Sequence, residues 1–415
     1  MSALAVLLLK RGVIVSGSDL TMNPQLEALG KLGAKIHVGH KQRNVPANCD
    51  MVVINGAIAD DNPELVFAHK KGVRVVERPE LLAHIARGYE SVIAVGGTHG
   101  KSTTTAMIGK IFTDAGLDPT VHNGAVGIDY ENPLSNLTIG STKFFITEAC
   151  EFKRSFLALK PTVAVITNIG YDHIDCYASF DELKQSFKQF SDNAKVTITP
   201  HACQVENITQ HQDGRFSFDI YADPDTCYLA PITCHLSVPG YHNVLNALAA
   251  IGVARHFRIP TCSVVSSLST FKGISRRFET LGHIGKCQII SDYAHHPNEI
   301  RTTIETASSL FQNFLLVFQP HTYTRTKALF PEFISTLSHT NLILFETYSA
   351  REVHIPGGHS RDLASSLGTK HYKRVDSLVR ALEKLAPRYD AIIVTGAGDL
   401  DPKLRNKLFR KSFCE

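Results

Sequence analysis

The sequence contains no hydrophobic run long enough to cross a membrane: ALAVLLL, at 3–9, is far too short. A secretory signal peptide is not indicated either, because no basic residue precedes this run and no small-residue cleavage pattern follows it. We predict a buried helix that ends at Lys10 and Arg11, with Gly12 as its cap. We therefore expect a cytoplasmic protein that does not engage a membrane.

Neither sign of charge dominates, because the chain has 43 Lys and Arg residues and 39 Asp and Glu residues, which gives a net charge of +4. No cluster of basic residues is dense enough to indicate a nucleic-acid surface. The nine cysteines are scattered and include no CxxC pair. That pattern argues against a zinc site or a disulfide framework and favours reduced thiols. Internal repeats and low-complexity tracts are absent as well.

The sequence does contain an alternation of short strand-like runs and helical stretches. Its 415 residues are too many to pack around one hydrophobic core of ordinary size. The residue pattern changes at about 203–239, where turns between runs of alternating polar and apolar residues indicate hairpins. A long helix with an apolar face is predicted to follow at 241–257. We predict an α/β fold of three domains. Their expected bounds are 1–90, 91–277 and 278–415.

The strand-like runs are short and rich in aliphatic residues, and most end in polar or glycine-rich tips. Ligands of open α/β sheets bind at the carboxyl ends of the strands, so these tips are the expected place of a site. The runs are VIVSGSD at 13–19, AKIHVGH at 34–40, DMVVING at 50–56, VRVVER at 73–78, SVIAVGG at 91–97, FFITEAC at 144–150, TVAVITN at 162–168, QIISDYAHHP at 288–297, FLLVFQPHT at 314–322, LILFETYSA at 342–350 and AIIVTGAGD at 391–399.

The stretch VIAVGGTHGKSTTT at 92–105 predicts a strand that enters a glycine turn and then a helix. The usual phosphate loop has its first glycine where this chain has Val95, so the loop here is shorter. Its backbone N–H groups and the helix N-terminus can still face phosphates. Lys101 can reach the β- and γ-phosphates, and the Ser102 hydroxyl can bind Mg²⁺. A chance glycine turn is the alternative interpretation.

Polar residues also end the neighbouring strands: Glu148 follows FFIT, and Asn168, Asp172 and His173 follow TVAVIT. Taken singly, each is an ordinary surface or cap residue. Together they predict a cage for Mg²⁺ and the γ-phosphate.

Eight motifs in series cover nearly the whole chain, and together they resemble the Mur ligase superfamily, in particular its alanine-adding branch of the Gram-positive type. The motifs are GTHGKST at 97–103, ITEACE at 146–151, TNIGYDHID at 167–175, PGYHNVLNALAA at 239–250, RRFE at 276–279, DYAHHPNEI at 292–300, FQPHTYTRT at 318–326 and GAGD at 396–399. The resemblance implies a Rossmann-like N-terminal domain, a central P-loop ATPase-like domain and a Rossmann-like C-terminal domain.

The resemblance also implies a reaction in peptidoglycan precursor synthesis. ATP, with Mg²⁺, phosphorylates the carboxylate of UDP-N-acetylmuramate, and the amine of L-alanine attacks the acyl phosphate to give an amide, ADP and phosphate. Positioning and charge stabilisation then supply most of the rate. The implied partners are these substrates, with no nucleic acid or membrane, and the protein is a monomer or a homodimer.

Carried onto this sequence, the resemblance implies four groups of site residues. Catalytic roles fall on Lys101, Glu148, His173 and Arg325, and Mg²⁺ contacts on Ser102, Glu148 and His173. ATP contacts fall on Gly97, Thr98, His99, Gly100, Lys101, Ser102, Thr103, His242, Asn243, Asn246 and Arg277. Contacts with the other substrates fall on Ser18, Asp19, Asp292, Tyr293, His295, His296, His321 and Arg325.

Simpler interpretations exist for several of these residues. His295 and His296 can form part of a zinc site, although no third ligand has suitable spacing. His242 and Asn246 lie one helical turn apart and can simply pack. Arg277 can be a surface cation in a linker.

Two departures from the family pattern matter. Family members carry a strand and a glycine-rich loop ahead of MSALA, and this sequence starts at MSALA. We therefore expect the N-terminal sheet to lack a central strand and the UDP site to lack its phosphate cradle. About thirty residues are also missing after Phe190, so we expect the central domain to lose a strand and a helix.

These departures leave other functions open besides alanine ligation. The alternatives are a ligase that recycles a whole tripeptide, a P-loop kinase, and a nucleotide-binding relative with impaired catalysis.

Overall fold

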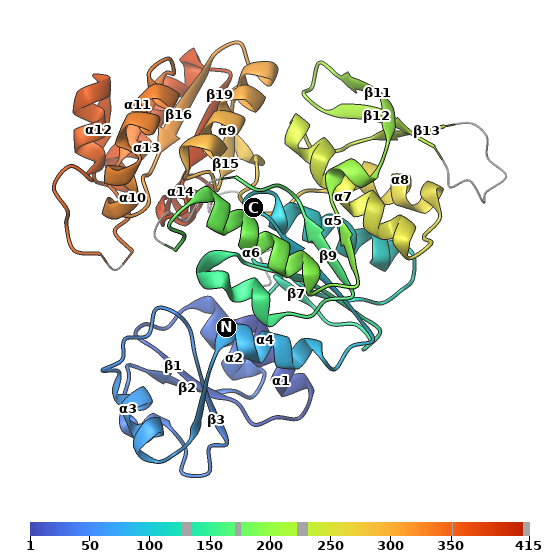
Figure 1. Cartoon of the computed structure of the whole chain (residues 1–415). Helices are drawn as coiled ribbons and strands as arrows, with labels where there is room; N and C mark the ends of the chain where they lie inside the picture. Colours follow the sequence, from blue (N-terminus) through green and yellow to red (C-terminus); the bar gives the residue numbers. More distant parts are fainter. Residues whose placement is uncertain (126–133, 171–175, 222–230, 351, 410–415) are drawn as a thin grey trace. The chain divides into compact units, whose positions relative to one another are not determined.

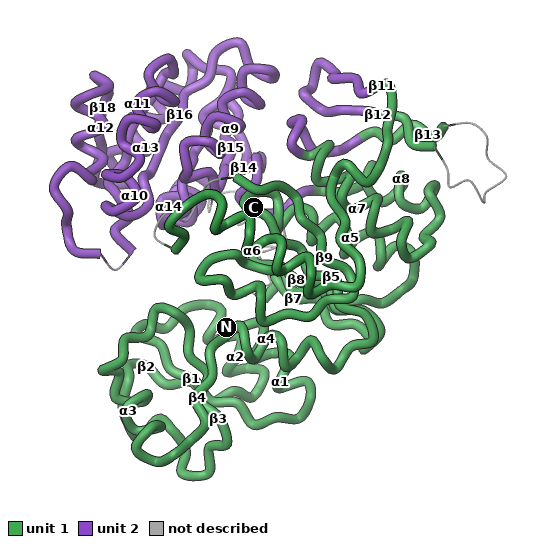
Figure 2. Tube along the Cα trace, in the orientation of Figure 1, with its two compact units in different colours: residues 1–207, 218–235, 243–272 green, residues 208–217, 236–242, 273–415 purple. Residues whose placement is uncertain are grey.

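The computed structural model describes residues 1–125, 134–170, 176–221, 231–350 and 352–409. The chain divides into two compact units, drawn in different colours in Figure 2. The first unit comprises 1–207, 218–235 and 243–272, and the second comprises 208–217, 236–242 and 273–415. Each unit is built on a six-stranded, mainly parallel sheet, so the predicted α/β class is confirmed.

The first ninety residues form four short strands and four helices (Figure 1). In chain order these are α1 (Ser2–Lys10), β1 (Ser16–Asp19), α2 (Pro24–Lys31), β2 (Lys35–Val38), β3 (Met51–Ile54), α3 (Pro63–Lys70), β4 (Arg74–Glu77) and α4 (Arg78–Ala86). The strands pair in parallel as two separate two-stranded sheets, β1 with β2 and β3 with β4. No described strand joins the two pairs.

Two boundaries in this part differ from the predictions. The strand predicted at 13–19 begins only at Ser16, and Ile14 is 95% exposed. Helix α1 does end at Lys10, but its cap residue is Arg11, and Gly12 follows in the left-handed region at φ 78°. A glycine one residue beyond the cap adopts this conformation without steric cost.

The central sheet of the first unit has the strand order β10-β9-β5-β8-β6-β7, and only β7 runs antiparallel to its neighbour. Strand β5 lies between β8 and β9, so the loop that follows it faces the carboxyl ends of both. The strands are β5 (Ser91–Gly96), β6 (Thr120–His122), β7 (Leu137–Thr138), β8 (Phe144–Glu148), β9 (Val163–Ile166) and β10 (Val196–Ile198). The helices are α5 (Lys101–Asp114), α6 (Phe180–Asp192), α7 (Tyr241–His256) and α8 (Thr261–Ser269).

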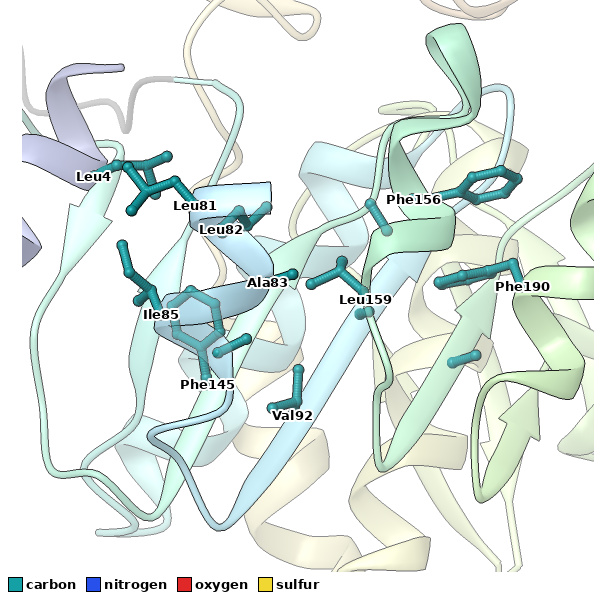
Figure 3. Packing of buried hydrophobic residues seen from close by; sticks show 14 of the residues in the cluster. Leu4, Leu81, Leu82, Ala83, Ile85, Val92, Phe145, Phe156, Leu159 and Phe190 are labelled. Atoms are coloured by element: carbon teal, nitrogen blue, oxygen red, sulfur yellow. The ribbon is translucent and has the colours of Figure 1, made fainter. Parts of the chain in front are cut away.

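One apolar cluster joins the N-terminal elements to this sheet. Figure 3 shows Ile85 of α4 beside Phe145 of β8, with Leu4 of α1 close by. The same cluster contains Phe156 and Phe190, both nearly inaccessible to solvent. Burial of such side chains contributes roughly 1.5–3 kcal/mol each, so α1 and α4 are fixed on the central sheet.

The segment after α6 adds a strand to the central sheet. Residues 196–198 form β10 beside β9, and the short 3₁₀ turn Pro200–Ala202 leads from it to the next sheet without an α-helix. That sheet has the order β11-β12-β13, so the strands predicted at about 203–239 are present. Its strands are β11 (Val205–Gln210), β12 (Phe216–Ile220) and β13 (Ile232–His235).

The sheet of the second unit has the order β14-β15-β19-β16-β17-β18, and only β14 is antiparallel. Both of its faces are buried, because Ile289 and Val317 pack in one apolar cluster and Ile290 and Phe318 in another. The strands are β14 (Glu279–Ile284), β15 (Cys287–Asp292), β16 (Phe314–Phe318), β17 (Leu342–Phe345), β18 (Lys370–Tyr372) and β19 (Ala391–Thr395). The helices are α9 (Pro297–Leu310), α10 (Tyr323–Ala328), α11 (Phe330–Leu337), α12 (Ser360–Leu367), α13 (Val375–Leu385) and α14 (Leu400–Leu408).

Two further observations bear on the exclusions drawn from composition. Within the described ranges, every helix is too short or too polar to span a bilayer. The cysteines in those ranges are all free thiols: Cys49, Cys150, Cys176, Cys203, Cys234, Cys262 and Cys287.

Candidate nucleotide and ligation site

The loop between β5 and α5 has a backbone that only glycine can adopt at two positions. Gly97 lies at φ 133° and Gly100 at φ 83°. A Cβ on Gly97 would lie 2.0 Å from Thr167 Oγ1, and one on Gly100 would lie 2.2 Å from Asn246 Oδ1. Backbone conformation and close approach therefore both require glycine here. The predicted strand, glycine turn and helix start are confirmed.

The end of β9 holds this loop in place. The Asn168 carbonyl and side-chain oxygens accept hydrogen bonds from the N–H groups of Thr98 and His99, each at 3.1 Å. Asn168 Nδ2 donates in return to the His99 carbonyl at 2.8 Å. The Thr98 hydroxyl adds bonds to the N–H and carbonyl of Gly170 at 2.9 and 3.0 Å. The loop is thus ordered before any ligand arrives, which reduces the entropy lost on binding.

Lys101 folds back over the loop and meets Glu151, a residue that the sequence analysis did not single out. Its Nζ donates to the Gly97 carbonyl at 2.5 Å and the Thr98 carbonyl at 3.1 Å. It lies 3.1 and 3.0 Å from the two carboxylate oxygens of Glu151. The Glu151 side chain is 1% exposed and that of Lys101 is 16% exposed.

Burial alone would lower the pKa of Lys101, but the charge of Glu151, with smaller effects of Cys150 and Glu148, raises it above its ordinary value. Lys101 is therefore cationic at neutral pH, as its predicted role beside a γ-phosphate requires. Burial raises the pKa of Tyr177 to about 12, with the charge of Glu151 as the second cause. The Tyr177 hydroxyl donates to the Glu151 carbonyl at 2.6 Å and fixes this residue's backbone.

The two described residues predicted to bind Mg²⁺ both contact the segment after β6. Asn123 Nδ2 donates to the Ser102 carbonyl at 3.0 Å, and the next residue, Gly124, donates its N–H to Glu148 Oε1 at 2.6 Å. A hydroxyl and a carboxylate at one sheet edge are the hard oxygen donors that Mg²⁺ prefers, so the donor set fits this ion. His173 lies outside the described residues. Within the described residues no group of three His, Cys, Asp or Glu side chains could hold a metal ion.

Helix α7 supplies the side chain that closes the loop from the other side. Asn246 Oδ1 accepts from the Thr104 hydroxyl at 3.2 Å, and its Nδ2 donates to Asn243 Oδ1 at 3.1 Å. Both asparagines are buried, so packing accounts for part of their presence. His242 is the second residue of the same helix but belongs to the second unit, where burial and then the charge of Arg277 lower its pKa to about 4.

In the second unit, Asp292 ends β15 and organises the turn that follows. Its two carboxylate oxygens accept from the N–H groups of Phe278 at 3.1 Å and Ala294 at 2.9 Å. Burial raises the pKa of Asp292 to about 6, although the charge of Arg277 opposes the shift. The guanidinium groups of Arg276 and Arg277 lie 4.8 and 5.3 Å from the centre of the Tyr293 ring. Arg277 is therefore positioned by an aromatic contact and is not a free linker cation.

The predicted histidines gather at the carboxyl ends of β15 and β16. The rings of His295 and His321 have centroids 5.7 Å apart. Burial lowers the pKa of both, and that of His321 to about 4, so both imidazoles are neutral at pH 7. No other described residue forms a hydrogen bond with His321 Nδ1. His296 instead caps α9, because its ring accepts the Asn298 N–H at 3.4 Å.

Arg325 lies in α10, one turn after Thr322, whose side chain caps that helix at φ 68°. The chain therefore turns sharply between His321 and Arg325 and brings both to the same strand end.

Ser18 and Asp19 lie at the carboxyl end of β1, where Ser18 joins a polar network. The Ser18 hydroxyl donates to Glu64 Oε2 at 2.7 Å and lies 2.9 Å from His40 Nδ1. Asn44 Nδ2 donates to Glu64 Oε1 at 2.7 Å. Ordered polar side chains at a parallel strand end are what a small-molecule site requires.

The fold and these sites define an α/β protein with a phosphate loop at the centre of the six-stranded sheet of its first unit. Family-wide sequence comparison matches three consecutive parts of the chain: the Mur ligase family, catalytic domain, at 1–90; the Mur ligase middle domain at 95–254; and the Mur ligase, glutamate ligase domain, at 276–398. These matches cover most of the sequence in the order expected. The chain belongs to the Mur ligase family.

Individual relatives agree with this assignment. The UDP-N-acetylmuramate–L-alanine ligase of Clostridium beijerinckii is 37% identical over 435 residues, which covers 96% of this chain and 93% of that protein. The corresponding ligase of Clostridium perfringens is 37% identical over 434 residues with the same coverage. The crystal structure of the ligase MurC of Thermotoga maritima is 28% identical, has a TM-score of 0.78, and covers 99% of this chain and 96% of its own.

Proposed function

We propose that this protein is an ATP-dependent ligase that joins L-alanine to the carboxylate of UDP-N-acetylmuramate, in the cytoplasm, during peptidoglycan precursor synthesis. Similarity to the clostridial alanine ligases over 96% of the chain supports this choice of substrates. The observation that carries the proposal is the ordered phosphate loop with Lys101 at its centre, flanked by Glu148. We further propose that the functional domains follow the predicted bounds 1–90, 91–277 and 278–415.

In the first step, a carboxylate oxygen of the muramate attacks the γ-phosphorus of ATP, and the bond from that phosphorus to the β,γ-bridging oxygen breaks to release ADP. Lys101 and the α5 N-terminus offset the charge that the reacting anions bring together. Ser102 and Glu148, with His173, would hold the Mg²⁺, which supplies further positive charge to the phosphate oxygens. The adenine end would lie against His242, Asn243 and Asn246.

In the second step, the alanine amine attacks the acyl carbon, and the tetrahedral intermediate expels phosphate to leave the amide. Alanine arrives as an ammonium ion and must lose a proton before it can attack. His321 is neutral at pH 7 and its Nδ1 forms no hydrogen bond with any described residue, so the ring can accept a hydrogen bond from the alanine ammonium. Arg277 and Arg325 would offset the negative charge of the acyl phosphate, and Asp292, Tyr293, His295 and His296 would shape the amino-acid pocket.

Phosphate release by the purified 415-residue chain tests this proposal. The assay contains ATP, Mg²⁺ and UDP-N-acetylmuramate, with and without L-alanine. Release that requires both substrates is expected. Release without alanine would instead indicate a kinase-like or hydrolytic activity. ATP binding without any release would indicate a relative with impaired catalysis.

A further inference from the structure

The turn after β8 contains two consecutive non-glycine residues in the left-handed region. Lys153 lies at φ 49°, ψ 31° and Arg154 at φ 53°, ψ 25°. Elsewhere in the described chain, non-glycine residues with positive φ are not adjacent to one another. Each such residue costs roughly 1–2 kcal/mol, and this strain persists where the surrounding structure imposes it, often at functional sites. The backbone of this turn is therefore strained at two consecutive basic residues.

The two side chains have different surroundings. Arg154 forms an ion pair with Glu182 and lies 5.5 Å from the centre of the Tyr177 ring. Lys153 is exposed, and its only described aromatic neighbour is Phe152, at 5.9 Å. The described part of the chain offers Lys153 no carboxylate within ion-pair distance. Arg154 is thus accounted for by local packing, whereas the charge of Lys153 is not neutralised.

The Lys153 ammonium reaches an N-terminal strand end. Its Nζ lies 3.5 Å from where a Cβ on Gly56 would be. Gly56 follows β3 by two residues, in a tight turn where Asn55 Oδ1 accepts the Ala57 N–H at 3.0 Å. In a parallel α/β arrangement this is the end of the strand at which ligands bind. A cation from the central part of the chain therefore lies in the expected binding region of the N-terminal part.

A shared core fixes this juxtaposition. Met51 and Val53 of β3 pack against the same apolar cluster as Leu157 and Ala158, which follow Lys153 closely in sequence. Phe156, at 1% exposure, lies within that cluster. The turn that carries Lys153 and the turn that carries Gly56 are thus anchored on one core, so their proximity does not depend on the flexible lysine side chain alone.

The N-terminal part has few other means of holding phosphates. The residues that cap helices α2, α3 and α4 are Asn23, Asn62 and Glu77, so none of these helices begins at a glycine turn of the kind seen before α5. A nucleoside diphosphate bound at this strand end would need a cation from elsewhere, and a lysine ammonium serves as a point charge for phosphate oxygens.

We propose that Lys153 binds the diphosphate of the UDP-linked substrate at the carboxyl end of β3. This inference rests on the proposed function for the identity of the nucleotide. It assigns a substrate contact to the central part of the chain.

The test measures UDP and uridine binding by calorimetry, with saturating ADP and Mg²⁺ so that UDP does not enter the phosphate loop at Lys101. Lys153→Gln keeps a polar side chain of similar length at an exposed position, so the fold is preserved. We expect it to weaken UDP binding about 10-fold, since one charge-assisted hydrogen bond is lost, and to leave uridine binding unchanged. Lys153→Arg should retain most of the UDP affinity.

Lys143→Gln is the matched control. Lys143 is also exposed, and its Nζ lies 5.4 Å from the ring centre of Phe144. It directly precedes β8, whereas Lys153 lies in the turn that follows β8. It should leave UDP affinity unchanged. Equal UDP affinity in the Lys153→Gln variant and the wild type would overturn the proposal, as would a wild type that does not bind UDP.

Kinetics separate this inference from the proposed function. Lys153→Gln should raise the KM for UDP-N-acetylmuramate about 10-fold and leave the KM values for ATP and L-alanine and the kcat unchanged. A wild type that binds UDP but releases no phosphate with both substrates would refute the ligase function and leave the diphosphate contact standing.

Discussion

The ammonium of Lys101 lies 3.0 Å from the buried carboxylate of Glu151, so the phosphate loop holds its cation by an internal anion. An arriving triphosphate competes with that carboxylate for Lys101. The pair keeps Lys101 charged and ordered, yet the lysine must turn from Glu151 and the loop carbonyls to reach a γ-phosphate. This exchange makes Lys101 and Glu151 the most informative pair for mutation.

Lys101→Ala should abolish alanine-dependent phosphate release, with a loss of at least ~10³-fold in kcat, because it removes the cation that we propose faces the γ-phosphate. Circular dichroism should show an intact fold. Lys110→Ala is the control, since Lys110 lies on the same helix and makes only an exposed ion pair with Asp114. Wild-type rates in Lys101→Ala would refute the assignment of the loop.

Glu151→Gln should destabilise the nucleotide-free protein by about 3 kcal/mol, because it leaves a buried ammonium without its counter-charge. Nucleotide should restore much of this loss, since phosphates supply the missing negative charge. Thermal melts with and without ATP and Mg²⁺ measure both effects. We expect a larger nucleotide-induced rise in Tm for the variant than for the wild type. Identical rises would show that Glu151 does not compete with phosphates for Lys101.

Gly100→Ala should prevent nucleotide binding and lower stability by ~2 kcal/mol or more, because its Cβ would lie 2.2 Å from Asn246 Oδ1 at φ 83°. Gly116→Ala provides a matched control beyond the other end of α5. Its φ is also positive, at 72°, but nothing lies within 4 Å of the new Cβ. It should cost only about 1 kcal/mol and leave ATP binding intact. Comparable ATP affinities in the two variants would argue against the close packing at Gly100.

The buried imidazole of His122 should make the protein less stable in acid. Burial, and then the charge of Arg78, lower its pKa from 6.5 to about 3. Between these values the unfolded chain binds the proton more tightly, so stability rises with pH across this window and falls as acid is added. His122→Asn can keep the bond to Thr147 Oγ1, which lies 2.8 Å from His122 Nδ1.

The expected result for His122→Asn is a shallower decline of Tm between pH 6.5 and pH 4 than in the wild type. His69→Asn changes an exposed histidine and should leave the wild-type slope in place. Parallel curves for the wild type and His122→Asn would contradict the buried neutral state.

The phosphate loop was predictable because its requirement is local: two glycines, a lysine and a helix start within a few residues. The sheet positions of Glu148, Asp292 and His321 followed from the rule that strand ends carry ligands. The partner of Lys101 was not predictable, since Glu151 lies fifty positions away and only the pairing of β5 with β8 brings it close. No spacing in the sequence carries that information.

Other differences have equally physical causes. The run at 13–15 has the composition of a strand, but regular pairing with β2 starts only at Ser16. The motif predicts a substrate contact for His296, and the structure adds that its ring caps α9, a contact that the spacing alone did not indicate. The sequence alone does not indicate the role that we propose for Lys153, because that proposal depends on a left-handed backbone and on the approach of its Nζ to Gly56. Each of these features depends on the folded structure and not on the local sequence pattern alone.

The two separate strand pairs of the N-terminal part have a consequence for its dynamics. Among the described strands of 1–90, β1 and β3 each have one paired neighbour, so this region has four sheet edges where a continuous sheet would have two. Amide protons along such edges exchange readily with solvent, and the region is expected to open locally well before the six-stranded sheets do. A ligand that binds this region only in its folded form would slow that exchange, so the stability of the region is expected to rise with substrate concentration.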